Sequence, residues 1–387
     1  MKSVNYLKST CQIILGGVLF FLSCSENNKT RINKDKVSIG IDVTKATSFD
    51  INSVADLVKY VPLETNNESL IGSINKLYIV NDSILVFDRK TKNIFLFNQN
   101  GKFVRKIGKK GNGPSEYIEF NDIYYDFDTN KLYAFERFQN KMFVYFLDGN
   151  LNEIINSHFS FNSFIKTHKG FWIYSCFNNN NPCKFNLIYT NDKLNTIKNG
   201  FFPQKNFVNI TNEPCFSEDK EHNKYFYYPS SNIIYQLNDN IIEPFLEINF
   251  FGKTLPYSEI INTKTIDEYD KIINRENYVG FIENVHILEQ FCIFNCLESN
   301  LNETIKSFQV WINLDRREVN VYDGYKNVVG SPSLNYLLYT TDKKELVYSI
   351  NPSALMDKEI EELKKIIPSI SYDSNPIIVF YKIKLST

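Results

Sequence analysis

One stretch of ten residues, 108–117, gathers three glycines, two lysines, a glutamate and a tyrosine in the order GKKGNGPSEY. A glycine-rich loop with a lysine can cradle a phosphate, because its backbone N–H groups and the ammonium group converge on one anion. Such loops lead directly into a helix, whereas the strand-like sequence YIEFNDIYY follows here. The stretch is therefore predicted to connect two strands rather than to bind phosphate.

Acidic and aromatic side chains at the end of this connector are candidates for ligand binding. Two predicted hairpin turns carry further charged pairs, and turns on a rigid scaffold are common sites of function. We predict that these groups share one face and form a ligand-binding surface of Glu116, Tyr117, Asp88, Arg89, Glu136 and Arg137. In the alternative interpretation, Glu116 binds N–H groups of its own loop and Tyr117 packs between sheets, because buried carboxylates are usually satisfied locally.

The sequence lacks the histidine and serine patterns of familiar enzyme classes. Its four histidines are His158, His168, His222 and His286, and none forms a His-x-x-x-His or similar ligand pair. It also lacks a Gly-x-Ser-x-Gly nucleophile motif. The polar run at residues 218–222 is predicted to be a solvated turn. We therefore expect no metal site, no cofactor and a binding protein rather than an enzyme.

The cysteines leave disulfide pairing open. Five remain once Cys11 and Cys24 are set aside with the amino-terminal segment, namely Cys176, Cys183, Cys215, Cys292 and Cys296. Cys176 and Cys183 flank a turn-like run and could bridge adjacent strands. Cys292 and Cys296 are predicted to share one face of a strand, where two side chains cannot easily bond each other. Buried free thiols are the prediction for most of the five.

The composition favours β structure and excludes general affinity for nucleic acid. The chain holds 24 Tyr and 32 Phe against 3 Met and 2 Trp, and aromatic side chains suit pleated, half-buried surfaces. The net charge of -1 offers no concentrated basic surface for phosphates. With 387 residues, 43% of them hydrophobic, the chain can bury a large core in one closed domain.

An internal repeat organises the first half of the chain. Over residues 85–107 the sequence matches itself at a shift of 48, which aligns Leu85 with Tyr133, Phe95 with Phe143 and Gly101 with Gly149. Each copy predicts three short strands, and a strand before each, at residues 76–80 and 122–125, makes four. Four antiparallel strands at this period are typical of a propeller blade, with residues 102–107 outermost and residues 122–125 innermost in the next blade.

Weaker copies continue this pattern to a sixth unit. They pair residues 171–174 with 185–189, 224–228 with 232–235, 291–294 with 308–312, and 336–339 with 377–383. The fold prediction is an all-β, six-bladed β-propeller of four-stranded antiparallel blades, in one domain over residues 37–387. Minor helical insertions are predicted at residues 257–274 and 352–367, the second capped by Ser353.

The terminal sequence PIIVFYKIKL, residues 376–385, predicts a strong strand at the end of the chain. A ring of blades is usually closed by pairing distant parts of the chain in one blade, which removes exposed sheet edges. We therefore predict that this strand pairs with, or lies beside, an early strand such as residues 60–63.

The amino terminus is predicted to be a targeting segment. Lys2 and Lys8 precede an apolar run, residues 13–22, that is too short to anchor in a bilayer. The sequence FLSC at residues 21–24 resembles the lipobox of bacterial lipoproteins, which implies a signal peptide at residues 1–23 and lipidation of Cys24. Residues 24–36 would then form a polar tether. An ordinary secretory signal cleaved elsewhere is the alternative.

Three stretches resemble one known family. Residues 61–79, VPLETNNESLIGSINKLYI, residues 97–117, and the closing NPIIVFYKIK at residues 375–384 are similar to six-bladed β-propeller lipoproteins of Bacteroidetes, which share the architecture of NHL-type propellers. The chain departs from the family pattern at Ser115, where a glycine is expected. A late Asn-Asp motif of the family has its nearest counterpart at residues 322–325.

The resemblance implies a lipid-anchored protein of the cell envelope, at the outer membrane, with the membrane face left open. We expect a monomeric binding or scaffold module for a glycan, a peptide or a partner protein. The alternative is an NHL-like hydrolase or lyase with a metal in the central channel.

Overall fold

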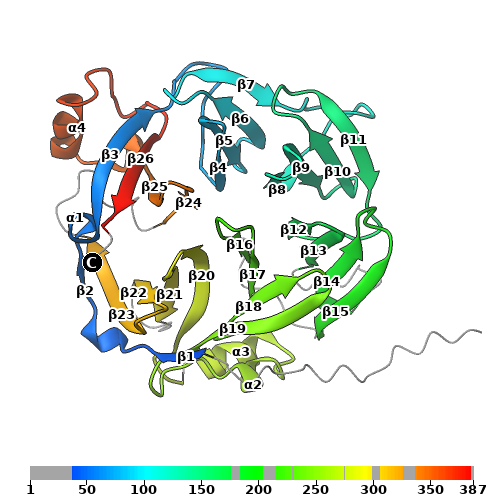
Figure 1. Ribbon diagram of the computed structural model, residues 1–387, viewed down its shortest axis with the longest axis vertical. Coiled ribbons are helices and arrows are strands. Elements are labelled where there is room, and N and C mark those ends of the chain that lie inside the picture. The colour runs from blue at the N-terminus through cyan, green and yellow to red at the C-terminus, as the bar shows by residue number, and fades with distance from the viewer. Residues whose placement is uncertain are drawn as a thin grey trace, which may run out of the picture. The chain divides into compact units, whose positions relative to one another are not determined.

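The computed structural model describes residues 37–175, 184–203, 215–228, 231–273, 275–298, 306–325 and 336–384. These residues form six antiparallel sheets arranged in a ring, with one strand of each sheet near the centre and another at the periphery (Figure 1). The predicted six-bladed β-propeller is confirmed.

Each blade contains four antiparallel strands. The blades are numbered along the chain, and the innermost strand of each is given first. Blade 1 contains β4 (Lys76–Val80), β5 (Ser83–Asp88), β6 (Asn93–Phe97) and β7 (Phe103–Ile107); blade 2 contains β8 (Phe120–Asp126), β9 (Lys131–Glu136), β10 (Lys141–Tyr145) and β11 (Leu151–Asn156); and blade 3 contains β12 (Ser163–Thr167), β13 (Gly170–Tyr174), β14 (Phe185–Asn191) and β15 (Ile197–Pro203). Blade 4 contains β16 (Phe216–Glu218), β17 (Lys224–Tyr227), β18 (Ile233–Asn238) and β19 (Ile241–Asn249); blade 5 contains β20 (Val279–Leu288), β21 (Phe291–Glu298), β22 (Lys306–Asn313) and β23 (Glu318–Tyr325); and blade 6 contains β24 (Tyr339–Thr340), β25 (Glu345–Ile350), β26 (Ile377–Ile383) and β3 (Ala55–Pro62).

The repeat at a shift of 48 corresponds to matching strands of blades 1 and 2. Even their irregularities match, because the pairing register shifts between Leu96 and Phe97 in blade 1 and between Val144 and Tyr145 in blade 2. Blades 3 and 4 have the same kind of shift between their third and fourth strands. A bulge increases the twist of a sheet, so this recurring feature helps each outer strand to turn away from the axis.

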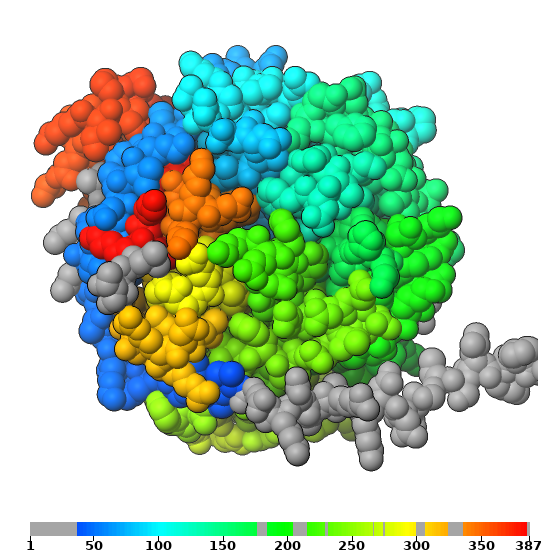
Figure 2. Space-filling model, viewed as in Figure 1, coloured from blue at the N-terminus to red at the C-terminus, as the bar shows by residue number. Residues whose placement is uncertain are grey.

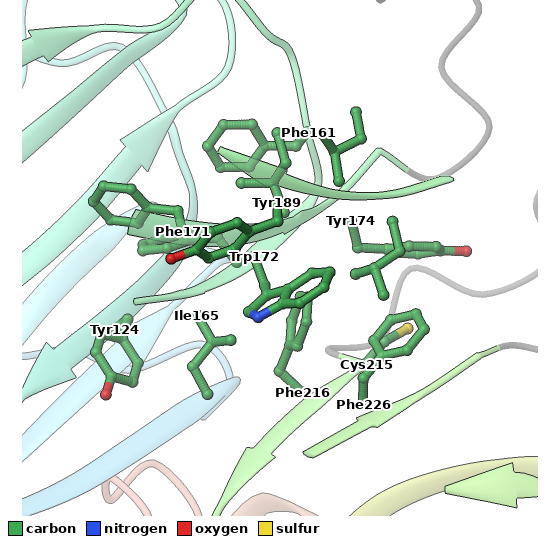
Figure 3. Close-up of a cluster of buried hydrophobic side chains, with 14 of the residues drawn as sticks. Tyr124, Phe161, Ile165, Phe171, Trp172, Tyr174, Tyr189, Cys215, Phe216 and Phe226 are labelled. Atoms are coloured by element: carbon green, nitrogen blue, oxygen red, sulfur yellow. The ribbon is translucent and has the colours of Figure 1, made fainter. Parts of the chain in front are cut away.

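Aromatic side chains fill the space between neighbouring blades. Phe135 of β9 stacks on Phe161, which precedes β12, with ring centroids 3.6 Å apart. Trp172 of β13 is fully buried and lies among Tyr189, Phe216 and Phe226, which come from blades 3 and 4 (Figure 3). Because both faces of a middle strand are covered by neighbouring blades, these strands are apolar throughout rather than alternating. This packing explains the high content of Phe and Tyr.

The ring is closed in blade 6, where the last strand of the chain meets an early one. β26 pairs antiparallel with β3, from Ile377 opposite Pro62 to Ile383 opposite Ala55. The predicted pairing of the terminal strand is confirmed. β3 in turn approaches blade 1 closely, because Gly101 has φ 78 and an added Cβ would lie 2.1 Å from the Pro62 carbonyl oxygen.

Two further strands at the amino terminus extend blades 4 and 5. β1 (Val37–Gly40) pairs in parallel with β19, and β2 (Thr47–Phe49) pairs in parallel with β23. After β2 the chain passes through α1 (Ile51–Val54) into β3, so residues 37–62 run along the outside of blades 4, 5 and 6 (Figure 1). These parallel fifth strands were not predicted from the sequence.

Blade 6 and the helical insertions differ in detail from the prediction. β25 lies between β24 and β26, whereas the sequence pattern made the segments around those two strands neighbours. Residues 257–274 contain two short helices, α2 (Tyr257–Ile260) and α3 (Ile266–Ile273).

Residues 352–367 begin with a 3-10 turn, Pro352–Ala354, before α4 (Asp357–Lys364). The Ser353 cap is wrong, because Asn351 caps the 3-10 turn by accepting the Ser353 N–H and Met356 precedes α4. Ile360 and Leu363 of α4 pack into the core of blade 6, as predicted for an insertion beside a blade.

Cys215, Cys292 and Cys296 are buried free thiols, as predicted, and burial raises the pKa of Cys292 and Cys296. Cys176 and Cys183 lie outside the described residues, as do the predicted signal peptide, Cys24 and most of the tether. Of the helices within the described ranges, none has the length and apolar character needed to cross a membrane.

Asn375 fastens the closed blade to the segment that enters blade 1. Its Oδ1 accepts the Ile71 N–H at 2.9 Å, and its Nδ2 donates to the Glu64 and Ser69 carbonyl oxygens at 2.7 Å each. We predict that Asn375→Ala lowers the free energy of unfolding by about 2–4 kcal/mol, because buried backbone groups lose their partners. Urea denaturation measures this change. The solvent-exposed Asn100→Ala serves as the control and should change stability by less than about 0.5 kcal/mol; equal effects of the two variants would contradict the role given to Asn375.

Candidate functional site

The predicted ligand-binding residues lie on one face of the propeller, which we call the connector face. It carries the β5–β6 turn (residues 89–92), the β9–β10 turn (residues 137–140) and the connector at residues 108–119. The Tyr117 hydroxyl donates to Asn93 Oδ1 at 3.3 Å, and Gln139 Nε2 donates to the Glu116 carbonyl oxygen at 3.4 Å. The structure therefore brings the connector and the two turns together.

Asp88 and Glu136 hold these turns in shape from inside. Both side chains are fully buried. The Asp88 carboxylate accepts N–H groups of Gly72 at 2.6 Å and Lys90 at 2.9 Å, and Glu136 accepts those of Phe138 and Gln139 at 3.0 and 2.6 Å. Their oxygens are thus occupied by local backbone groups.

The neighbouring arginines are more accessible. The Arg89 guanidinium donates to the Asn121 carbonyl oxygen at 3.4 Å and is partly exposed. Arg137 is exposed, and its guanidinium lies 5.6 Å from the centroid of the Phe138 ring.

Glu116 and Tyr117 follow the alternative interpretation. Glu116 Oε2 accepts the Gly113 N–H at 2.9 Å, and Glu116 Oε1 lies 2.6 Å from Lys109 Nζ. Lys109 first, and then the Gly113 N–H, hold the pKa of Glu116 below its usual range. A Cβ at Gly111 would lie 2.0 Å from Glu116 Oε2, so a larger residue there would force the Glu116 side chain to shift.

Tyr117 is only 1% exposed and stacks on Phe120 with ring centroids 3.9 Å apart. Burial raises its pKa to about 12. The side chain therefore packs between blades 1 and 2 and offers no surface to a ligand.

A second site, which the sequence did not reveal, lies on the axis of the ring. The inner strands surround an axial cavity of about 190 Å³. Side chains of these strands fill most of the central gap that the ribbon shows (Figure 2). The cavity walls combine aromatic rings with polar groups, chiefly Tyr78, Tyr124, Phe127, Phe216, Tyr227 and Tyr339 together with Lys76, Ser217, Glu218, His222, Asn284, His286 and Asp342.

The cavity extends to the face opposite the connector. Phe127, His222 and Asp342 lie in the β8–β9, β16–β17 and β24–β25 turns. In an antiparallel blade the turn between the first and second strands lies at the opposite end from the turn between the second and third. We call this side the hairpin face.

Aromatic rings gather at this end of the cavity. Tyr78 lies with its ring centroid 6.4 Å from that of Phe127 and 6.0 Å from that of Tyr339. The His222 ring lies 5.6 Å from Phe127. Burial first, and then the nearby carboxylates of Asp122 and Glu218, raise the pKa of Tyr78, so its hydroxyl stays protonated.

Glu218 joins several cavity groups. It contacts His222 Nδ1 at 2.8 Å and Lys224 Nζ at 3.4 Å, and it is bonded to the Tyr124 hydroxyl, whose pKa is raised first by burial and then by this carboxylate. The predicted solvated turn at residues 218–222 is thus wrong for Glu218, whose side chain is only 15% exposed. β16 is the innermost strand of blade 4 and ends at Glu218, so this side chain lies beside the axis. The polar sequence around Glu218 did not indicate that position.

Asn284 lines the axial cavity, and its contact with His286 fixes which way its amide group points. His286 Nε2 lies 2.8 Å from the Leu337 carbonyl oxygen and 3.0 Å from Asn284 Oδ1. Because a carbonyl only accepts, Nε2 carries the proton, and the amide atom that faces it must be the oxygen. The Asn284 Nδ2 group then points away, and within the described part of the chain it is buried without a partner, as is Ser217 Oγ.

The described residues hold no group of three or more His, Cys, Asp or Glu side chains placed to bind a metal ion. Lys76 is paired with Asp122 at 2.7 Å, and Lys220 is paired with Glu289 at 3.0 Å. The arrangement can therefore supply aromatic faces, neutral donors and a carboxylate–imidazole pair to a bound molecule.

Sequence and structure comparisons give the chain relatives without assigning a function. The model of a family described as "Domain of unknown function (DUF4934)" matches residues 35–382. No protein with a curated description matches.

Two solved structures show the fold most clearly. A protein of Bacteroides fragilis whose name describes it as putatively exported has 18% identity and a TM-score of 0.71, with 90% of this chain and 100% of that chain covered. A member of the DUF4221 family from Bacteroides vulgatus has 10% identity and a TM-score of 0.52, with 86% and 98% covered.

Protonation of His286 should cost stability at low pH. Burial lowers the pKa of His286 to about 4 from 6.5. Since the folded state keeps the neutral ring, stability is fully present above pH 6.5 and is lost as the pH falls toward 4. We predict a loss of about 2 kcal/mol from this group by pH 4.5, measured by urea denaturation.

The control is His286→Gln, whose amide can still donate to the Leu337 carbonyl oxygen. It should lose clearly less stability between pH 6.5 and 4.5 than the wild type. Equal losses in both proteins would show that His286 does not contribute.

Proposed function

The chain belongs to the DUF4934 family, and we propose that it is a binding protein whose axial cavity takes a neutral carbohydrate from the hairpin face. Ligand pockets are typically concave, with apolar walls and a few convergent polar groups. The axial cavity has this composition.

The observation that carries the proposal is the mixed lining of the axial cavity, where aromatic rings lie beside two residues, Asn284 and Ser217, with polar atoms that have no partner among the described residues. Asn284 is 6% exposed, and its Nδ2 has no partner among the described residues. Ser217 is partly exposed, but its Oγ is buried and likewise has no partner there. A buried polar group without a partner costs about 1–3 kcal/mol, so each such group calls for an explanation, and a water or a ligand reached by a small side-chain shift is one. An amide donor and a hydroxyl suit the hydroxyl and ring oxygens of a sugar.

Charge and ring chemistry favour a neutral ligand. Lys76, Lys220 and Glu218 already have partners of opposite charge in the protein. A charged ligand would therefore have to compete with these pairs. The flat rings of Phe127 and Tyr339 can cover the apolar C–H face of a sugar ring while its hydroxyls reach the polar wall.

We also propose that the protein is exported and lipid-anchored through Cys24 at the outer membrane. The support is the amino-terminal pattern of Lys2, Lys8, the apolar run and the FLSC sequence, together with the Bacteroides fragilis structure whose name describes it as putatively exported. A carbohydrate-binding propeller fits the envelope, where a tethered protein meets glycans. Radiolabelled fatty acid incorporation, lost in Cys24→Ala, tests the anchor.

Two other functions are each supported by one observation. An outer groove of about 470 Å³ beside the connector is lined by Lys109, Glu116 and Tyr145, and it is where a partner protein would use the predicted connector face. The hydrolase or lyase alternative rests on the Glu218–His222 pair. Metal analysis of the purified protein tests that alternative, because a stoichiometric ion in the channel would favour it.

Two phenylalanines at opposite ends of the β9 strand test which face binds. Phe127→Ala removes an aromatic wall of the axial cavity, so affinity for the best sugar found in a screen of neutral mono- and oligosaccharides should fall about tenfold or more. Isothermal titration calorimetry measures the affinity, with thermal melts as the check on folding.

Phe138→Ala is the matched control, because Phe138 is 61% exposed in a turn of the connector face. It should leave sugar affinity unchanged. Loss of binding in Phe138→Ala, with normal binding in Phe127→Ala, would move the site to the connector face and refute the proposal.

A further inference from the structure

We propose that the ligand is an oligosaccharide, one unit of which occupies the axial cavity while the next lies in a second subsite between blades 6 and 1. This inference rests on the carbohydrate-binding function proposed above and adds the length and the path of the ligand. The second subsite is a separate hollow on the hairpin face, here called the rim cavity.

The rim cavity lies between blades 6 and 1 and reaches from their inner strands out to β3 and the β6–β7 turn. Its volume is about 240 Å³, and it is lined by residues of β3, β4, the β4–β5 turn, the β6–β7 turn and the β24–β25 turn. The two cavities are therefore similar in size, at about 190 and 240 Å³. A ligand made of similar repeating units suits two adjacent spaces of similar volume.

Shared walls join the two cavities. Phe127, Tyr339 and Asp342 line both of them. The two cavities are therefore neighbours, and in the proposed complex the sugar chain passes Tyr339 between them. The path runs outward along the hairpin face, away from the connector.

The rim cavity has the same chemical character as the axial one. Ile79, Ile84 and Phe380 are apolar members of its lining, and Asn81 and Gln99 bring neutral amides from two turns. Charges of both signs are present and partly paired, with Lys343 Nζ 3.8 Å from Asp82 Oδ1 and Lys59 Nζ 4.5 Å from the centroid of the Phe380 ring.

A neutral ligand rich in hydroxyls fits this lining better than a charged polymer, because neither sign of charge dominates. A peptide that binds by strand addition would pair its backbone with an exposed sheet edge. The groups that line the rim cavity come instead largely from hairpin turns, which offer side-chain amides and carboxylates.

The experiment compares ligand length in wild-type protein and a rim variant. Neutral homo-oligosaccharides of one to six units, from glucan, mannan, xylan and galactan series, are titrated by calorimetry. In the series that binds, affinity should rise about tenfold or more from one unit to three. Asn81→Gly/Gln99→Ala should remove this gain and leave affinity for the single unit unchanged.

The rim variant keeps the turn geometry, because Asn81 has φ 48, a conformation that glycine adopts freely. The matched control is Asn130→Gly/Asn150→Ala. Asn130 has φ 54 in the equivalent turn of blade 2, and Asn150 lies in the β10–β11 turn; neither residue lines either cavity. The control should retain the full gain in affinity with length.

Three results would overturn the inference. Equal affinity for one and for several units, or a rim variant that retains the gain, would leave the axial site intact but remove the second subsite. A gain with length seen for neutral peptides of two to six residues, and not for sugars, would make the occupant a peptide. Absence of binding to every sugar in all series would instead refute the proposed function itself.

Discussion

The antiparallel pairing of β26 with β3 holds the ring closed, and the position of both cavities depends on it. β24 and β4 belong to blades 6 and 1, which are brought together only when the ends of the chain meet. Asn375 and the close approach of Gly101 to Pro62 then fix the distance between these blades. The rim cavity lies between them, and Tyr339 of β24 faces Tyr78 of β4 in the axial one. A change in closure would therefore alter the site directly.

The connector face and the axial cavity show two different uses of polar residues. On the connector face, the carboxylate oxygens of Asp88, Glu136 and Glu116 accept hydrogen bonds from nearby backbone N–H groups. Along the axis, Asn284 of β20 and Ser217 of β16 have buried polar atoms without partners among the described residues. The acidic side chains of the connector face thus stabilise turns, whereas the neutral side chains of the axial cavity have the polar groups that the proposed ligand would use.

The fold was largely readable from the sequence. The repeat that aligns Leu85 with Tyr133 reflects real structural equivalence, and the strong terminal strand predicted closure correctly. β1 and β2 were missed because VSIG and TSF are short and have no strong apolar pattern; they exist because blades 4 and 5 offer edges to pair with. β25 was missed since Tyr336–Tyr339 and Ile377–Ile383 alone seemed to complete a blade, and long-range pairing decided otherwise.

The candidate site was much less readable. The strands that hold Tyr78 and Tyr124 were predicted to be innermost, but which side chains face the axis depends on strand twist and bulges. β20 is the clearest case, because its register shifts between Gly280 and Glu283 and again before His286, and Asn284 has φ 53. The bulges change the direction in which the side chains of this strand point, and no local sequence pattern predicts them. His222 was set aside for want of a nearby partner, and its partner Glu218 proved to lie four residues earlier.

The outer strap of residues 37–62 has a consequence for the order of folding. β1, β2 and β3 find their partners in β19, β23 and β26, in each case more than 200 residues later in the chain, as in the pairing of Val37 with Leu246. Contacts so distant in sequence form slowly, because a long loop must close first. During synthesis, blades 1 to 3 can form from hairpins that are adjacent in sequence, before the partners of residues 37–62 have been made. Residues 37–62 are thus synthesised before the blades but pair after them, and their pairing completes the ring.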